Sequence, residues 1–210
     1  MTLKTIARLA GVLMLGAGLA GCMDVTAEID VTSETTGKAT TTMTMGAEFY
    51  PMIKQMQEAA EAGGEDDTAS ADTDFCQEEG DVLTENADGS ATCTSVKEGT
   101  LAEITADGDG PNEDTTFTVV SPGVVRVAFK TDEMKNQVTQ GEEQDAQTAA
   151  MMKAYFEGHS VTIRIKGKRI VETNMTKVGD NAAETVIPFT DLLDGNVDLP
   201  DEMFAVVDTN

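Results

Sequence analysis

Residues 161–193, VTIRIKGKRIVETNMTKVGDNAAETVIPFTDLL, carry the pattern that decides the fold. Val161, Ile163 and Ile165 alternate with polar residues, which is the period of a strand with one buried face. Turns that contain glycine, at Gly167-Lys168 and at 179–181, interrupt this alternation. The stretch therefore predicts three short strands and a terminal cap, over residues 161–165, 170–175, 183–189 and 191–193.

The same alternation of apolar and polar residues continues upstream, where it predicts hairpins. The first has strands over 25–31 and 39–45 with a turn at Thr36-Gly37-Lys38. The stretch with two cysteines predicts a hairpin near 81–96, followed by a short strand near 101–105. Ser121-Pro122-Gly123 marks the turn of another hairpin, over 117–130.

Two segments have helical rather than strand periodicity. One is expected over 47–62, with Pro51 in its first turn and Gly63-Gly64 after its end. The other begins at Thr131 or Asp132 and runs to Gly158. Its apolar stripe consists of Thr148, Met151, Met152, Tyr155 and Phe156.

These elements together predict an α+β domain. Short connections favour antiparallel pairing, so we expect an antiparallel twisted sheet of hairpins with two helical segments packed on one face. The expected organisation is a single domain over 22–210. Two acidic stretches, 63–74 and 107–114, lack large apolar residues and are expected to be solvated loops.

Residues 1–22 have the composition of a secretory signal peptide. Lys4 and Arg8 lead into an apolar run over 9–19, which is shorter than the roughly 20 residues that a membrane-spanning helix needs. The ending Leu19-Ala20-Gly21-Cys22 resembles the lipobox of bacterial lipoproteins, in which the cysteine thiol is diacylated and the peptide is cut before it. The resemblance implies a signal peptide over 1–21 and lipidation, including palmitate, at Cys22; an ordinary secreted protein is the alternative.

The expected location is the cell envelope, as a lipid anchor on the periplasmic face of the outer membrane. An Asp directly after the lipidated cysteine would resemble the signal that retains lipoproteins in the inner membrane. This chain has Met23 at that position, which favours the outer membrane. Several acyl chains on one protein give stable anchoring, whereas a single chain anchors only marginally.

Cys76 and Cys93 remain after Cys22 is assigned to the anchor. In an oxidising compartment the default for two remaining cysteines is a disulfide. Their spacing is not that of a CxxC redox motif or a zinc site. We therefore expect a structural disulfide and no metal at this pair.

The chain has 38 acidic and 14 basic residues, a net charge of -24. Removing residues 1–21 removes Lys4 and Arg8 and no acid, which takes the charge to -26. A nucleic acid partner is therefore not expected, because binding a polyanion requires a basic surface.

Three other groups of residues have side chains that could carry chemistry. Asp107, Asp109 and Asp114 are weak calcium candidates, since Pro111 occupies a ligand position of the EF-hand order. His159 and Ser160 are neighbours at a strand start, and strand neighbours point to opposite faces, so they are poorly placed as base and nucleophile. The sequence contains no GxSxG, HExxH, P-loop or GxGxxG motif.

Methionine is frequent, at 12 residues, and tryptophan is absent. The pairs Met43/Met45 and Met52/Met56 have spacings that could bind Cu(I), but they also occupy expected core positions, and core filling is favoured. The same methionine side chains could also line a pocket for an apolar ligand.

Residues 161–193 are also similar to the closing part of the mycobacterial LppM-like domain and related bacterial lipoproteins. CMDVTAEIDV, at 22–31, looks like the first strand of such domains. The resemblance implies a curved sheet with helices, and a role in lipid binding has been proposed for some members. Val186-Ile187 departs from the family where an aromatic residue is usual.

These observations favour a non-enzymatic, lipid-anchored envelope lipoprotein that acts as a binding or assembly module. Its partners are the membrane and either a protein or a lipid ligand, and no cofactor is expected. The second hypothesis is a carrier of a lipid or other amphipathic ligand in a Met-rich apolar pocket, and the third is an enzyme of unknown type.

Overall fold

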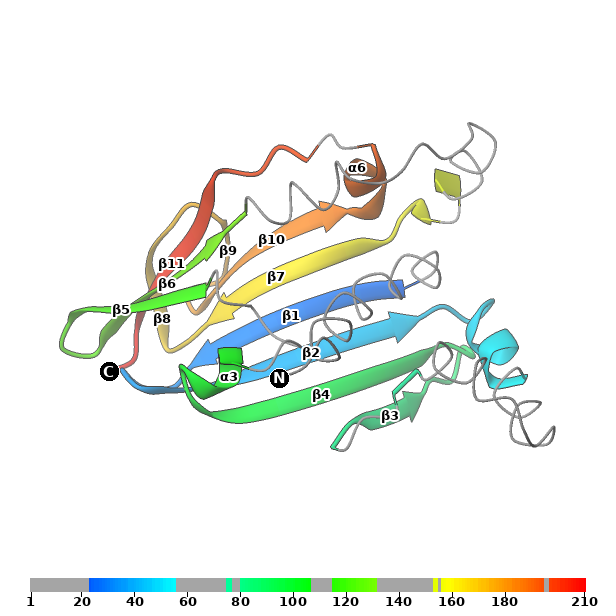
Figure 1. Ribbon diagram of the computed structural model, residues 1–210, viewed down its shortest axis with the longest axis horizontal. Coiled ribbons are helices and arrows are strands. Elements are labelled where there is room, and N and C mark those ends of the chain that lie inside the picture. The colour runs from blue at the N-terminus through cyan, green and yellow to red at the C-terminus, as the bar shows by residue number, and fades with distance from the viewer. Residues whose placement is uncertain are drawn as a thin grey trace, which may run out of the picture. The chain divides into compact units, whose positions relative to one another are not determined.

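The computed structural model describes residues 23–55, 75–76, 80–106, 115–131, 153–154, 156–194 and 197–210. Within these ranges the chain forms two sheets, whose strand orders are β3-β4-β2-β1-β7-β10-β9 (sheet A) and β5-β6-β11-β8 (sheet B; Figure 1). The elements are β1 (Met23–Val31), β2 (Thr36–Met45), β3 (Val82–Glu85), β4 (Ala91–Thr100), α3 (Glu103–Ala106), β5 (Thr115–Ser121), β6 (Val124–Lys130), β7 (Ser160–Lys166), β8 (Arg169–Thr173), β9 (Thr176–Val178), β10 (Ala182–Pro188), α6 (Phe189–Leu193) and β11 (Glu202–Asp208).

The predicted α+β fold class is wrong, because the described part of the chain is mostly strand in two sheets. Its helices are short: α3, α6 and a segment over 50–55. The sheets are also not built from hairpins alone, since β1 pairs with β7 in parallel. Local alternation correctly indicated strands, but short connections did not indicate how strands far apart in sequence pair.

The chain divides into two compact units. Unit 1 contains residues 1–24 and 42–95, and unit 2 contains residues 25–41 and 96–210. Strands β1, β2 and β4 each have residues in both units.

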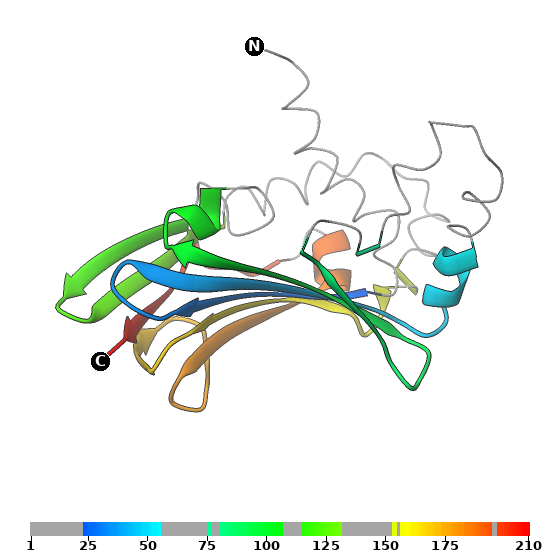
Figure 2. The same cartoon turned by 90° about the horizontal axis from the view of Figure 1, so that it is seen from below.

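In unit 2, β7 lies between β1 and β10 in sheet A. It lies parallel to β1, with Val25 opposite Val161 and Asp30 opposite Lys166. It lies antiparallel to β10, which in turn pairs with β9. The three longer strands run side by side in both views (Figures 1 and 2).

Sheet B includes a strand that lies in the C-terminal residues, for which no element was predicted. β11 is hydrogen-bonded to β6 on one side and to β8 on the other, antiparallel to both. Met203, Ala205 and Val207 alternate along it and are buried. This period-two pattern is the signal that could have located the strand.

The core of unit 2 contains apolar side chains from both sheets and from α3. Its members are Ile29, Val31, Leu101, Ile104, Val125, Val127, Phe129, Ile163, Ile165, Ile170, Met175, Ala183, Ile187, Leu199, Met203, Ala205 and Val207. Alternate residues of β6 (Val125, Val127, Phe129) and of β11 (Met203, Ala205, Val207) point into this core, as the period of a strand requires.

Gly167 stands where the chain passes from sheet A to sheet B. The predicted hairpin of 161–165 with 170–175 is therefore wrong, since β7 and β8 lie in different sheets. A Cβ on Gly167 would lie 2.1 Å from Cγ1 of Val207 and 3.2 Å from the carbonyl oxygen of Val31. Only glycine lets the backbone pass this close to the core.

The turn between β1 and β2 lies four residues earlier than predicted. The Ser33 hydroxyl accepts hydrogen bonds from the N–H groups of Thr35 and Thr36, which closes the turn locally. Gly37 instead lies in β2, where a Cβ would meet the Asp30 carbonyl oxygen and Leu101 Cδ2, each at 2.9 Å. The glycine therefore serves close packing rather than a turn.

The hairpins of β3 with β4 and of β5 with β6 are confirmed, the second with its turn at the predicted Gly123. The first predicted helix is present over 50–55, with Pro51 in its first turn; residues 56–62 lie outside the described residues. The second helical region is described at 153–154 and 156, and Gly158 follows it with a φ of 89°.

The short strand predicted near 101–105 is wrong, because α3 occupies these residues. Thr100 and Glu103 form a capping box: the Thr100 hydroxyl accepts the Glu103 N–H at 3.2 Å, and Glu103 Oε2 accepts the Thr100 N–H at 2.9 Å. Thr-x-x-Glu is a helix-start signal in the sequence itself.

Candidate functional site

The predicted anchor, Cys22, lies just outside the described residues, and β1 begins at the next residue. β1 starts at Met23, which is itself buried. No spacer therefore separates Cys22 from the first strand. Full extension covers at most about 3.6 Å per residue, so the Cα of Val25 lies within about 11 Å of that of Cys22.

In unit 2, several elements meet at the end of sheet A where β1 enters. Val161 lies between Val25 and Ile187 in the register. One residue further, Pro188 pairs with Ser160 and leads directly into α6. The Phe189 N–H donates to the His159 carbonyl, and the Phe189 ring lies 5.2 Å from that of Phe156. The exposed Leu193 ends this helix.

The solvent face of sheet A in unit 2 carries a network of ion pairs that was not predicted. Arg164 of β7 donates to Glu184 Oε2 through Nε at 2.9 Å and Nη2 at 2.6 Å. It also lies 3.6 Å from Glu28 on the other side. Lys166 donates to Glu28 at 3.1 Å and lies 3.9 Å from Asp30. A basic strand thus lies between two acidic ones.

The individual charges of this network were visible in the sequence, but their pairing was not. Glu28 and Asp30 alternate along one predicted strand, as Arg164 and Lys166 do along another. Glu28 and Lys166 are 138 positions apart in the sequence, and only the parallel register of β1 with β7 brings them together. Opposite charges on adjacent strands favour this register over a shifted one.

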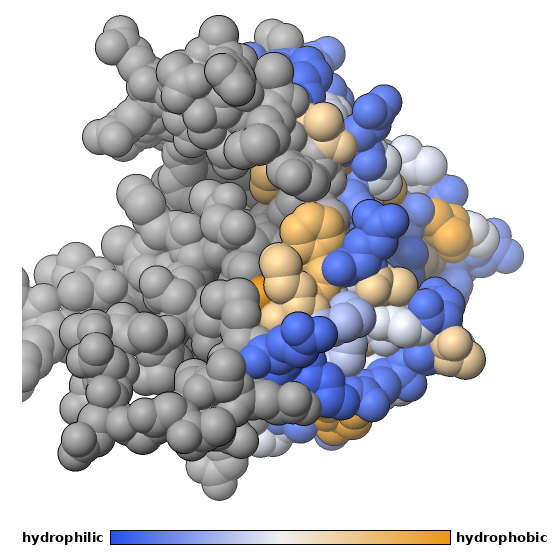
Figure 3. All heavy atoms as spheres, turned by 90° about the vertical axis from the view of Figure 1, so that its right-hand side faces the viewer, coloured by the Kyte–Doolittle hydropathy of each residue, from blue (hydrophilic) through white to orange (hydrophobic). Residues whose placement is uncertain are grey.

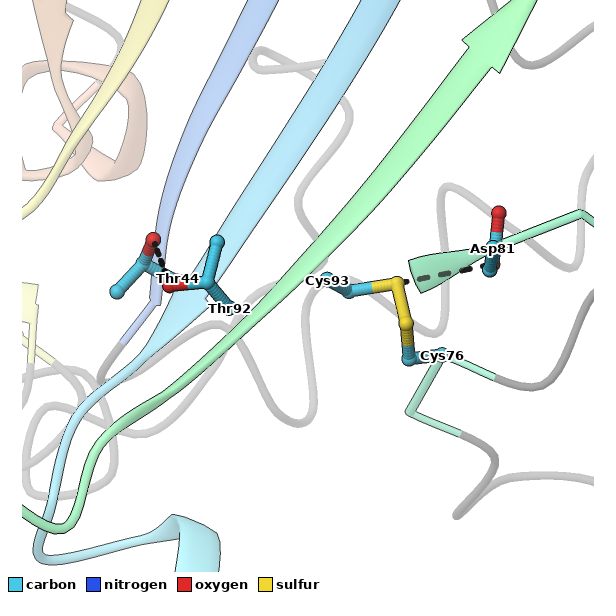
Figure 4. Close-up of a disulfide and its surroundings, with 5 residues drawn as sticks. All are labelled: Thr44, Cys76, Asp81, Thr92 and Cys93. Carbon is cyan, nitrogen blue, oxygen red and sulfur yellow. Dashed lines mark hydrogen bonds between the residues drawn. A yellow bond between two sulfur atoms is a disulfide. The ribbon is translucent and has the colours of Figure 1, made fainter. Parts of the chain in front are cut away.

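Cys76 and Cys93 are joined by a disulfide in unit 1, with an S–S distance of 2.09 Å (Figure 4). Cys93 is a buried residue of β4, and Cys76 has a φ of 65°. Thr92 is the residue before Cys93, and its hydroxyl oxygen lies 3.2 Å from that of Thr44.

Asp81 is the third member of this cluster. One of its carboxylate oxygens lies 3.6 Å from Cys93 Sγ (Figure 4). Ligand atoms of Cys76, Asp81 and Cys93 all lie within 4.8 Å of one another. Thiolates are the metal-binding form of cysteine, so the disulfide that joins the two sulfurs prevents them from acting as a metal site.

In unit 1, Glu85 of β3 connects the helical segment 50–55 to the β3–β4 hairpin through side-chain hydrogen bonds. Glu85 Oε1 accepts hydrogen bonds from the Tyr50 hydroxyl and from Lys54 Nζ, both at 2.7 Å. Those bonds, the one from Lys54 first, hold the pKa of Glu85 below its ordinary value. Burial raises the pKa of Tyr50, and the Glu85 carboxylate raises it further. The Tyr50 ring packs edge-on against Phe75.

The remaining candidate residues are not brought together into a site in the described part of the chain. Asp107, Asp109 and Asp114 lie outside the described residues, as does Met56. Met45 is buried, whereas Met52 is half exposed, so these two do not share one buried lining. His159 precedes β7. Its backbone N–H donates to the Phe156 carbonyl, and its carbonyl accepts from the Phe189 N–H.

Exposed apolar side chains gather on strands at the sheet edges. β3 is exposed along its whole length and includes Val82 and Leu83, and β5 exposes the adjacent valines Val119 and Val120. Figure 3 shows one face of the molecule, where hydrophobic residues lie among hydrophilic ones. Edge strands keep unpaired backbone groups, which can pair with another chain.

Among the described residues, no helix has both the length and the apolar character that crossing a membrane requires. No protein-family model matches the chain, and no curated protein matches it. A solved structure with some similarity is the NMR structure of the folded domain of LppM from Mycobacterium tuberculosis. It is 11% identical, with a TM-score of 0.45, and the match covers 89% of this chain and 90% of that one.

Proposed function

We propose that this chain is an envelope lipoprotein, anchored through Cys22, whose β-rich domain serves as a non-enzymatic binding or assembly module. The observation that carries the proposal is the run Leu19-Ala20-Gly21-Cys22, placed directly before the first strand of the fold. A cleavage before Cys22 would leave the whole of β1 intact. Anchoring on the periplasmic face of the outer membrane is part of the proposal.

The exposed edges of the sheets support a binding role. β5 is an edge strand of sheet B and β3 an edge strand of sheet A, and both leave apolar side chains in solvent. Addition of a strand from a partner would pair their free backbone groups and bury these side chains. The single histidine of the chain and its neighbour Ser160 are poorly placed for base and nucleophile, which favours binding over catalysis.

The anchor is tested by replacing Cys22 in the producing bacterium. Cys22→Ser should abolish incorporation of a labelled fatty acid and release the protein from the membrane, because the thiol that carries the diacyl group is gone. The double variant Cys76→Ser/Cys93→Ser is the matched control and should keep the label. Labelling of the Cys22→Ser protein would contradict the lipoprotein assignment.

The binding role is tested by cross-linking lipidated protein in intact cells. A discrete adduct with a second envelope component should form, and charged replacements at the β5 edge, Val119→Lys and Val120→Lys, should weaken it. An adduct unaffected by those replacements would place the contact elsewhere. No adduct at any exposed edge would contradict a binding module.

A further inference from the structure

Two ends of unit 2 can be defined along the axis of β1. The entry end contains Val25, Val161, Ile187 and α6. The far end contains Asp30, Lys166 and Ala182, which are aligned with one another in the register, and Val178 of β9 opposite Ala182. The two ends are about 16 Å apart, since five residues separate Val25 from Asp30 at about 3.3 Å each.

The turn of sheet B between β5 and β6 also lies at the far end. Gly123, in this turn, donates its N–H to the carboxylate of Glu34, which follows β1 in the chain. Thr209 N–H donates to the Gly123 carbonyl at 2.8 Å, so β11 ends there too. Val120, next to this turn, therefore marks the far end of sheet B.

Cys22 is joined by one peptide bond to Met23, so a lipid on Cys22 keeps the entry end close to the bilayer. The backbone from Cys22 to Val25 spans at most about 11 Å, too little for a flexible spacer. The entry end presents exposed apolar side chains, Leu193 on α6 and Val186 on β10. Near them, the Lys153 ammonium and the Asp194 carboxylate form an ion pair at 2.5 Å.

The charged face of sheet A is unsuited to lying on lipid. Glu28 and Glu184 are 19% and 20% exposed there and share Arg164. Pressing this face onto a bilayer would remove the remaining water from these charges, which is costly. The net charge of -26 also repels the domain from anionic headgroups.

We infer that unit 2 stands upright on the membrane, with its entry end against the lipid headgroups and its far end, including the turn between β5 and β6, exposed to the periplasm. This inference rests on the proposed lipidation of Cys22. It assigns α6 as the membrane-contacting element, and leaves the turn between β5 and β6 open to a partner.

The orientation is tested with full-length lipidated protein added to preformed phosphatidylcholine vesicles that carry a nitroxide on a fraction of their headgroups. A fluorescent amino acid replaces Leu193, Val178 or Val120, one at a time, and leaves the three cysteines unchanged. These positions have similar exposed fractions, 42%, 41% and 51%, so the probes differ mainly in location. The upright orientation predicts a large loss of fluorescence at Leu193 and little at the other two.

Each alternative orientation gives a different result. Quenching at Val178 equal to that at Leu193 would mean that the domain lies on sheet A, and strongest quenching at Val120 would mean that it rests on sheet B. Either outcome overturns the inference. It is also overturned if no position is quenched although the protein floats with the vesicles, because the domain would then be held away from the surface.

The same samples separate this inference from the proposed function. Intact mass and vesicle flotation report lipidation directly, whatever the orientation. A protein without acyl chains that fails to float would contradict the lipoprotein assignment itself. Cys22→Ser protein, which lacks the acylated thiol, should show no quenching at any of the three positions.

Discussion

At the scale of single residues, Gly167 controls how the two sheets of unit 2 are joined. Gly167→Ala should destabilise the protein by about 1–3 kcal/mol, the usual cost of forcing a methyl group into a packed core. The added Cβ would lie 2.1 Å from a methyl carbon of the fully buried Val207. Urea unfolding at constant pH measures the change.

A double-mutant cycle identifies the cause of this loss. Val207→Ala removes the colliding methyl group, so adding Gly167→Ala in that background should cost much less than it does alone. Equal costs in both backgrounds would show that the loss does not come from the clash with Val207, and would point instead to the Val31 carbonyl oxygen, 3.2 Å from the added Cβ.

Glu103 gives a prediction about pH. Hydrogen bonds from the Thr100 N–H and hydroxyl lower the pKa of Glu103 from its ordinary value of 4.5. Because the folded pKa lies below the unfolded one, the ionised carboxylate stabilises the fold above about pH 4.5, and this contribution is lost as the pH falls through the folded pKa.

Glu103→Gln should therefore destabilise the protein at pH 7, and the difference from the wild type should shrink as the pH falls below 4.5. Urea unfolding of both proteins over pH 3–7 tests this. A difference that stays constant with pH would mean that the charge of Glu103 does not contribute.

At the scale of elements, the basic strand β7 is held between the acidic strands β1 and β10. Arg164→Gln should cost about 0.5–1 kcal/mol, in the range of partly exposed ion pairs. It leaves Glu28 and Glu184 without their shared partner, and the loss should shrink in concentrated NaCl because salt screens such charges.

Arg169→Gln is the matched control for this substitution. Arg169 is 61% exposed and pairs with Asp208 at 2.6 Å. We expect a smaller effect, since a more exposed pair contributes less. An equal loss in the two variants, unchanged by salt, would mean that the network on sheet A does not act through charge.

Local alternation predicted the hairpins of β3 with β4 and of β5 with β6, but it misplaced the turn between β1 and β2. The β5–β6 hairpin follows from alternation around Ser121-Pro122-Gly123. α3 was missed although its Thr-x-x-Glu signal lies in the sequence, because the apolar residues around it also fit a short strand. β11 was not predicted, because no turn beside it in the sequence marks a hairpin partner.

At the scale of the whole molecule, net charge is the dominant quantity. Self-repulsion at -26 should make the mature protein less stable at low ionic strength. Its melting temperature should rise as NaCl increases from about 10 mM to about 500 mM, since the screening length falls from roughly 30 Å to a few ångströms.

Magnesium and calcium at matched ionic strength provide the control for this prediction. Equal responses would mean that the acidic stretch 107–114 is only solvated. A rise specific to calcium would instead indicate a site among Asp107, Asp109 and Asp114. A melting temperature that does not change with NaCl would show that the charge is spread too widely to strain the fold.

Features that depend on neighbouring residues can be recognised in the sequence alone. Alternation along 161–165 and 183–189 indicates a strand with one buried face. The residues up to Cys22 indicate the proposed lipid anchor in the cell envelope. These patterns are complete within a few residues, so they can be recognised without knowledge of the rest of the chain.

Only the tertiary structure decided which strands pair and how the sheets form. The parallel register of β1 with β7, the central position of β11 and the ion pairs of Arg164 join residues far apart in sequence. Alternation shows that a strand has a buried face but not which strand lies beside it. Two sheets form because their apolar faces bury one another, and that free energy depends on the assembled core rather than on any local pattern.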